Sequence, residues 1–187
     1  MAVKQSDFED KIKKFSLMED ARDDLWERAR TLLVKGYEIE AYILILATWN
    51  FADFRYFLKN FNLGSFEDTI KKLSPIFRKL ENKLFQEVNF KDEEIRKDIK
   101  LVYSELKKHV RQTGTSKIMA LKNPDLFVMW DTGIRKLYNI DNKGNPDDYI
   151  EFLEKMKEEF KNIKWQDKNR PLAKVIDEYN YVLTQEE

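Results

Sequence analysis

The side chains best suited to chemistry form a basic segment between residues 107 and 122, in which five cations occur without an acid. They are Lys107, Lys108, Arg111, Lys117 and Lys122, with His109 among them. Gly114 lets the backbone approach a partner closely, and we expect the amides of Thr115, Ser116 and Lys117 to lie free at a helix start. Free amides at a helix N-terminus, together with cations, bind phosphate. The segment therefore predicts contact with nucleic acid; the alternative is a solvated basic helix face.

Two helices and an apolar linker have to position this segment. Apolar residues recur at three- and four-residue steps over residues 92–111, which predicts an amphipathic helix. The pattern breaks at residues 113–116, and a short helix is predicted over residues 116–123. An apolar linker, residues 126–130, then leads to Asp131, whose side chain suits the cap of the next helix.

The rest of the sequence also predicts helices and no convincing strand. They are expected over residues 6–15, 19–35, 38–49, 52–61, 149–160 and 171–183, with short helices after Ser65 and from Pro75 onward. The segment 38–49 is apolar nearly all round, which indicates a buried central helix. We therefore predict an all-α fold, a compact array of about ten helices in one domain spanning residues 1–187. Helices from both ends of the chain are expected to pack on the same body.

Composition limits the classes of site that this sequence can build. Hydrophobic residues make up 42% and aromatic residues 13% of the chain, which is enough for a real core. Basic and acidic residues number 34 each, so any attraction to nucleic acid must be local. The sequence has no Cys and one His, which excludes disulfides, thiolate zinc sites and cysteine-ligated iron–sulfur clusters. We expect no metal and no cofactor.

The sequence contains no segment typical of a signal peptide or a membrane span. Residues 1–10 are polar, and the most apolar run, residues 41–49, is too short to cross a bilayer. These features predict an intracellular, cytoplasmic protein that does not bind membranes. The richness in Lys and Glu without Cys is typical of thermophile proteins.

Two stretches resemble the active-site block of the helix-hairpin-helix DNA glycosylases. They are residues 114–121, GTSKIMAL, and residues 130–137, WDTGIRKL. In that family a glycine-rich hairpin leads into a helix that carries a lysine in bifunctional members, and an apolar stretch leads to a catalytic aspartate at the next helix. Upstream, residues 42–50, YILILATWN, are similar to the family's early buried helix, whose polar end probes the duplex. The resemblance covers about residues 38–140.

The resemblance implies a fold like that of the glycosylases and a role for each matched residue. It places Lys117 at the family's lysine, which attacks the sugar of an extruded nucleotide and forms a Schiff base. It places Asp131 at the aspartate, which stabilises positive charge on the sugar or activates the nucleophile. Trp49 and Asn50 match the duplex probe. Trp130, directly before Asp131, is expected to be either a pocket wall or a side chain of the core. With the basic segment, the expected DNA-binding residues are Lys107, Lys108, Arg111, Gly114, Thr115, Ser116 and Arg135.

Three functions remain open from the sequence. The first is a DNA base-excision enzyme, an N-glycosylase or abasic-site lyase whose partner is damaged or abasic double-stranded DNA. The second is a non-catalytic nucleic-acid-binding module of the same fold. The third is an interaction or structural protein, in which Asp131 only caps a helix. The enzyme requires Lys117 and Asp131 to face one cleft beside Trp49; the binding module requires only the basic segment.

Overall fold

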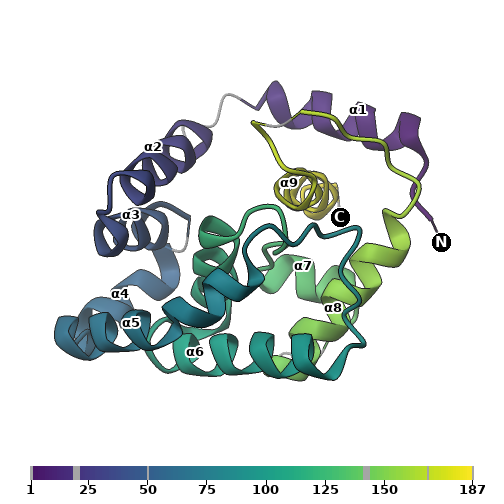
Figure 1. The fold of residues 1–187 in the computed structure, drawn as a ribbon. Helices are drawn as coiled ribbons and strands as arrows, with labels where there is room; N and C mark the ends of the chain where they lie inside the picture. Colours follow the sequence, from purple (N-terminus) through teal and green to yellow (C-terminus); the bar gives the residue numbers. More distant parts are fainter. Residues whose placement is uncertain (1, 19–21, 50, 141–143, 168, 187) are drawn as a thin grey trace.

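The computed structural model describes residues 2–18, 22–49, 51–140, 144–167 and 169–186, and its regular secondary structure there is helical (Figure 1). The helices are α1 (Gln5–Ser16), α2 (Arg22–Val34), α3 (Glu38–Trp49), α4 (Phe51–Asn60), α5 (Leu63–Leu80), α6 (Glu93–Lys122), α7 (Thr132–Leu137), α8 (Pro146–Glu159) and α9 (Leu172–Thr184). No strand occurs among the described residues, so the predicted all-α fold class is confirmed. None of the helices in these ranges is long and apolar enough to cross a membrane.

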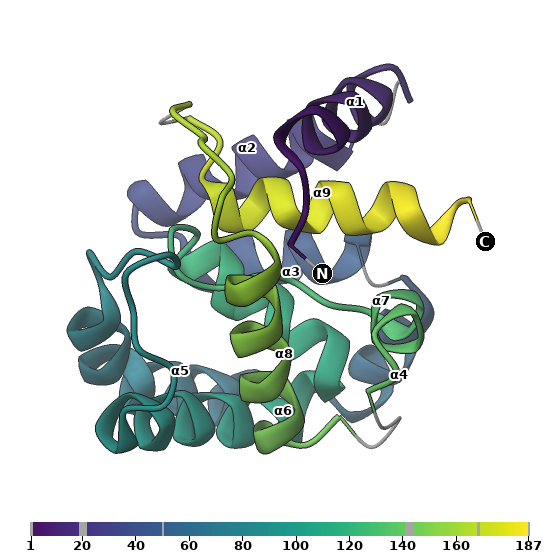
Figure 2. The ribbon, with the colours of Figure 1, turned by 90° about the vertical axis from the view of Figure 1, so that its right-hand side faces the viewer.

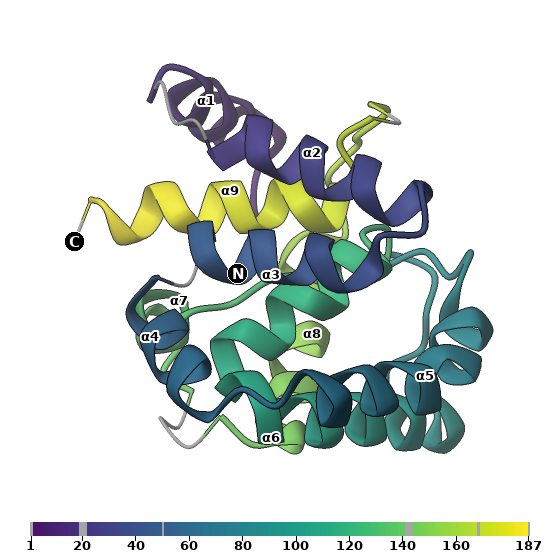
Figure 3. The same cartoon turned by 90° about the vertical axis from the view of Figure 1, so that its left-hand side faces the viewer.

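Helix α9 lies in the middle of the molecule, between α1 and α2 on one side and α6 and α8 on the other (Figure 2). Helices α1 and α7 pack on α9, whereas α5 and α8 pack on α6. Helices α2 and α3 pair on the side of the molecule opposite α8 (Figure 3). Elements from the whole length of the chain thus surround the C-terminal helix.

The two ends of the chain are joined by hydrogen bonds as well as by packing. The amide of Val3 donates to the carbonyl of Glu159 over 2.8 Å. The hydroxyl of Tyr179 on α9 donates to the carboxylate of Asp7 on α1 over 2.6 Å. Between them the ring of Phe8, which is 0% exposed, stacks on Tyr179 with centroids 5.7 Å apart. As expected from the sequence, the first and last helices pack on the same body.

Helix α6 breaks at a different residue from the one that the sequence predicts. Asp92 caps its start, because its Oδ1 accepts hydrogen bonds from the amides of Glu94 and Ile95, both over 3.0 Å. The kink falls at Arg111, whose φ of 56° and ψ of −177° lie in a region that is strained for a residue other than glycine. The predicted break at residues 113–116 is wrong, because Thr115 continues the helix and donates from its hydroxyl to the Arg111 carbonyl over 2.6 Å.

Helix α5 is continuous where two short helices were predicted. Asn62 caps its start, and its side chain accepts from the Ser65 amide over 2.9 Å. Pro75 lies inside the helix rather than at the start of a new one. Its side chain is exposed, so the carbonyl of Lys71, which loses its amide partner at Pro75, lies near solvent that can hydrate it. A proline on the solvent side therefore leaves this helix intact.

Candidate active site

A small cavity of about 70 Å³ lies between α1, α3, α6, α7 and α9. Its lining residues are Phe15, Trp49, Lys117, Trp130, Asp131, Ile134, Asp177 and Tyr181. Four of these, Trp49, Lys117, Trp130 and Asp131, are site residues expected from the sequence. The structure brings the lysine and the aspartate to one cavity beside Trp49, although they belong to different elements.

Lys117 projects from α6 into the protein interior. The residue is 7% exposed. Its Nζ lies 5.8 Å from the centroid of the Trp49 ring, within the range of a cation–π contact. The same amine donates a hydrogen bond to the Trp49 carbonyl at the end of α3. The end of α3 therefore fixes the amine at the cavity wall, away from bulk solvent.

Asp131 lies at the start of α7 and also at the cavity wall. Its Oδ1 accepts a hydrogen bond from the Ile134 amide over 2.9 Å and so caps α7. The residue also lines the cavity. The Asp131 side chain thus caps a helix, as one interpretation of the sequence expects, and also lines the cavity, as the other expects.

The neighbours of the lysine and the aspartate are bonded to each other. The hydroxyl of Ser116 donates to the Trp130 carbonyl over 3.0 Å, and it lies 3.2 Å from the Trp130 amide, which donates to it. Both residues are 0% exposed. Because Ser116 precedes Lys117 and Trp130 precedes Asp131, this bond fixes the distance between the two elements that carry the candidate catalytic pair.

A second buried lysine lies close to the cavity. Lys174 on α9 is 4% exposed, and its Nζ lies 4.9 Å from the ring centroid of Trp49 and 5.6 Å from that of Trp26. It forms an ion pair of 2.7 Å with Glu178, whose carboxylate also pairs with Arg170. Two lysines thus contact the same tryptophan ring, and one of them has a buried counter-ion.

Asp177, one turn along α9, adds a second carboxylate to the cavity wall. Burial raises its pKa to about 7; the positive charges of Lys174 and Lys117 act in the opposite direction, while Asp131 and Glu178 raise it further. The carboxylate is therefore within electrostatic reach of both lysines. At neutral pH it exchanges its proton readily, which suits a group that transfers protons.

Sequence reasoning missed Lys174 and Asp177. Their spacing with Glu178 and Tyr181 places all four on one side of a helix, opposite the apolar residues 172, 175, 176, 179 and 183. Such a charged side normally faces water, so its burial was not expected. The signal that could have indicated burial of this side was Tyr181, an aromatic residue that lies on it.

The structure does not present most of the expected phosphate contacts on the surface. Gly114, Thr115 and Ser116 are buried inside α6. The prediction that the amides of Thr115, Ser116 and Lys117 lie free at a helix start is wrong, because α6 includes all three residues. Arg135 is 2% exposed and lies over the Trp130 ring at 5.3 Å. These residues do not form an open phosphate site, because all of them are buried.

The remaining basic residues lie at the end of the first part of α6. Lys108 and Arg111 are exposed, and Lys107 is half-buried. Lys107 donates to the Gly144 carbonyl over 2.9 Å, and Lys108 pairs with Glu105 over 2.5 Å. Asn50, the other predicted duplex-probe residue, lies outside the described residues.

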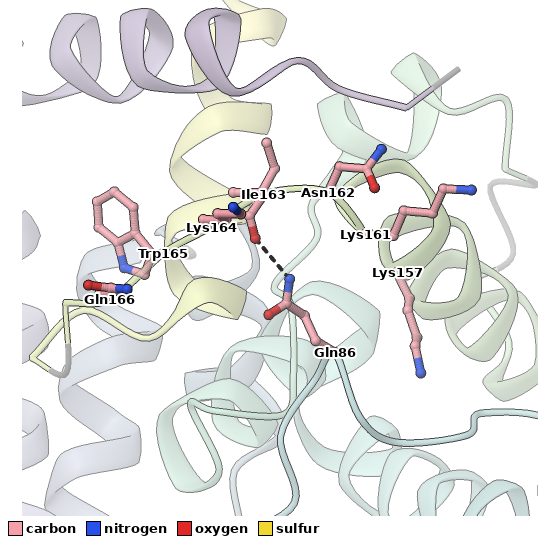
Figure 4. Close-up of a pocket in the computed structure, with 8 residues that line it drawn as sticks. All are labelled: Gln86, Lys157, Lys161, Asn162, Ile163, Lys164, Trp165 and Gln166. Atoms are coloured by element: carbon pink, nitrogen blue, oxygen red, sulfur yellow. Dashed lines mark hydrogen bonds between the residues drawn. The ribbon is translucent and has the colours of Figure 1, made fainter.

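A larger groove of about 620 Å³ lies elsewhere, beside residues 157–166 (Figure 4). Lys157 and Lys161 line it but point in different directions. Lys157 donates to the Val88 carbonyl over 2.6 Å, and Lys161 pairs with Glu158 over 2.5 Å. The groove therefore lacks the convergence of reactive groups that the small cavity has. Within the described ranges, no group of three or more His, Cys, Asp or Glu could hold a metal ion.

Comparison with known proteins gives no relative for this arrangement: no family model matches the chain, and neither a curated protein nor a solved structure matches it.

Proposed function

We propose that this protein is an abasic-site lyase of DNA base excision repair, in which Lys117 forms a Schiff base with the opened sugar. The observation that carries the proposal is that Lys117 and Asp131 line one cavity with Trp49. A nucleophilic lysine must be held near its target carbon with a carboxylate close by, and the cavity provides that proximity.

The second cation at Trp49 supports the same chemistry. Lys174 and Lys117 both lie within cation–π distance of this ring. A neighbouring cation and burial favour the neutral, nucleophilic form of a lysine amine, whereas the ring face favours its charged form. Asp131 then provides the negative charge that stabilises the positively charged imine.

The size of the cavity favours the lyase over the N-glycosylase. A cavity of about 150 Å³ holds a benzene ring. At about 70 Å³, the cavity of this protein is too small for a nucleobase but admits the aldehyde end of an opened deoxyribose. An abasic site has no base to accommodate, so it is the substrate that fits.

Trapping with borohydride tests the proposal, because reduction converts a Schiff base into a stable covalent bond. The unmodified protein, incubated with duplex DNA that contains one abasic site, is expected to form a trapped adduct. Lys117→Ala should abolish the adduct. Lys122→Ala should retain it, because Lys122 does not line the cavity and forms a 2.7 Å ion pair with Glu38. Asp131→Asn should lower strand cleavage by about 100-fold or more with little change in binding.

Two results would contradict the proposal. One is the absence of any adduct with the unmodified protein. The other is an adduct that persists in Lys117→Ala, which would assign the nucleophile to a different amine, Lys174 being the next to examine.

Contact with the duplex is proposed to run through the end of the first part of α6, where Lys107, Lys108 and Arg111 lie. Their joint replacement by Glu should abolish retention of duplex DNA on a gel, and retention by the unmodified protein should fall as salt rises. Unchanged retention would favour an interaction protein instead.

A further inference from the structure

We infer that Asp177 is a third catalytic group of the cavity and that it removes the C2′ proton of the sugar after Lys117 has formed its imine. The inference rests on the proposed function and assigns the elimination step to a residue outside the segment that resembles a known family.

Asp177 lines the cavity from α9, whereas Asp131 lines it from the residue before α7. Asp177 projects from α9 to the same cavity as Lys117, so it faces the lysine from another element. Carbon C2′ is bonded directly to C1′, the carbon that Lys117 attacks. A base opposite the lysine is therefore placed to reach the neighbouring carbon of a sugar bound between them.

The other two carboxylates are already engaged. Asp131 uses an oxygen to cap α7, and Glu178 is held by ion pairs with Lys174 and Arg170. Among the described residues, by contrast, Asp177 interacts with its neighbours through charge and burial rather than through a hydrogen bond. Both oxygens of Asp177 are thus available to accept a proton from a ligand.

The ionisation of Asp177 suits this step. Its pKa of about 7 means that the carboxyl is ionised in about half of the molecules at neutral pH and is a stronger base than an ordinary aspartate. The titratable side chains that face it are Lys117 from α6, Asp131 before α7, and Lys174, Glu178 and Tyr181 from α9.

The chemistry balances without an added reactant. The neutral amine of Lys117 attacks the C1′ aldehyde, a carbon–nitrogen bond forms, and the carbonyl oxygen leaves as water. The Asp177 carboxylate then takes a proton from C2′. The C–H electron pair forms the new carbon–carbon double bond while the 3′ phosphate leaves with the electron pair of its bond to C3′. One water hydrolyses the imine, frees Lys117 and releases the unsaturated aldehyde, and Asp177 returns its proton to solvent.

Measuring the two steps separately tests the inference. In Asp177→Asn, borohydride trapping should remain within about threefold of the unmodified protein, since Lys117 is intact. Strand cleavage should fall by at least about 100-fold, the usual contribution of a general base. Asp177→Glu, which keeps a carboxylate, should recover part of the cleavage. In the unmodified protein, cleavage of the preformed imine should rise through about pH 7, and the Asn variant should lose this rise.

The controls separate this inference from the proposed function and from misfolding. Glu186→Gln removes a carboxylate that pairs with Lys11 and Lys14 away from the cavity, and should change neither step. Thermal unfolding establishes that each variant is folded. Trapping with full cleavage in Asp177→Asn would overturn the role of Asp177 alone, as would an equal loss of both steps in the folded variant. Absence of trapping with the unmodified protein would overturn both proposals.

Discussion

Buried charges surround Trp49, and each of them has a different means of tolerating its position. Lys174 has a counter-ion in Glu178, and Lys117 donates to a backbone carbonyl. Asp177 is half-buried and forms no hydrogen bond or ion pair with the described residues; removal from water is the main cause of its raised pKa, and the two lysines act in the opposite direction. A carboxylate in such surroundings is costly to ionise, so a group of this kind is typically retained for function rather than for stability.

The unmodified protein should therefore lose stability as pH rises through the range in which Asp177 ionises. Its pKa is about 7 in the folded protein, against 3.8 for an ordinary aspartate. Between these values the folded state binds the extra proton, so the free energy of unfolding falls as pH increases from about 4 to about 7. The expected contribution is on the order of 2–4 kcal/mol.

Urea unfolding at pH 4.5 and pH 8 measures this effect. Asp177→Asn should remove it, which makes the variant more stable than the unmodified protein at pH 8 and similar to it at pH 4.5. Asp125→Asn, at an exposed position, should keep the full pH dependence. An equal stability difference at both pH values would show that the carboxyl does not titrate as described.

Lys174 is expected to be the residue of this group on which stability depends most. Lys174→Met keeps the shape of the side chain but leaves the Glu178 carboxylate, 1% exposed, with only one ion-pair partner. Breaking a buried pair in this way costs about 3–5 kcal/mol. The matched control is Lys100→Met, which removes a pair with Asp147 at the surface and should cost less than about 1 kcal/mol. An equal loss of stability in the two variants would mean that water reaches the Lys174–Glu178 ion pair as it reaches a surface pair.

At the scale of elements, the linker before α7 depends on Ser116 for its position. Ser116→Ala removes the hydroxyl that the buried Trp130 amide donates to. The unsatisfied amide should cost about 1–3 kcal/mol of stability. Trapping of the abasic site should fall as well, because the elements that carry Lys117 and Asp131 are no longer bonded.

The control for this prediction is Ser65→Ala, where the hydroxyl is exposed at the start of α5. It should leave the unfolding midpoint and the trapped adduct nearly unchanged. If Ser116→Ala unfolds at the same urea concentration as the unmodified protein, the bond to Trp130 does not hold the linker.

An element could be predicted from the sequence where its cap or its apolar pattern depends on residues close together in the chain. The cap at Asp131 and the periodic part of α6 depend on neighbouring residues, and both were predicted correctly. The break in α6 was predicted over residues 113–116, which include Gly114, whereas the kink falls at Arg111. A non-glycine residue rarely adopts a positive φ, so the local sequence does not point to Arg111.

Only some of the side chains that meet around the cavity could be predicted from the sequence. Lys117, Asp131 and Trp49 were expected to meet because of the resemblance, and the structure places them at one cavity. Lys174 and Asp177 were not expected, because their exposure depends on helices α1, α2 and α3, which are distant in sequence. Burial of a charged helix face is a property of the assembled fold.

For the whole molecule, the packing of α1 on α9 should control both stability and the site. Phe8→Ala removes a ring that is 0% exposed and contacts Phe160 and Tyr179. The expected cost is about 3–5 kcal/mol, measured by urea unfolding. Because Phe15 on the same helix lines the cavity, trapping should also fall at temperatures where the variant is still folded.

Leu17→Ala, which changes a side chain that is 74% exposed just after α1, is the matched control and should cost less than about 0.5 kcal/mol. A Phe8→Ala protein with full stability would show that α1 is not part of the cooperative fold.

The cavity takes its walls from Phe15 near one end of the chain and from Asp177 and Tyr181 near the other. A ribosome makes α9 after every other helix described, so Lys117 leaves the exit tunnel well before the carboxylate and aromatic side chains of α9 that enclose it. A growing chain therefore carries the lysine without the residues of α9 that complete the cavity. The proposed chemistry would require the cavity, so it would begin only when synthesis has reached the last helix.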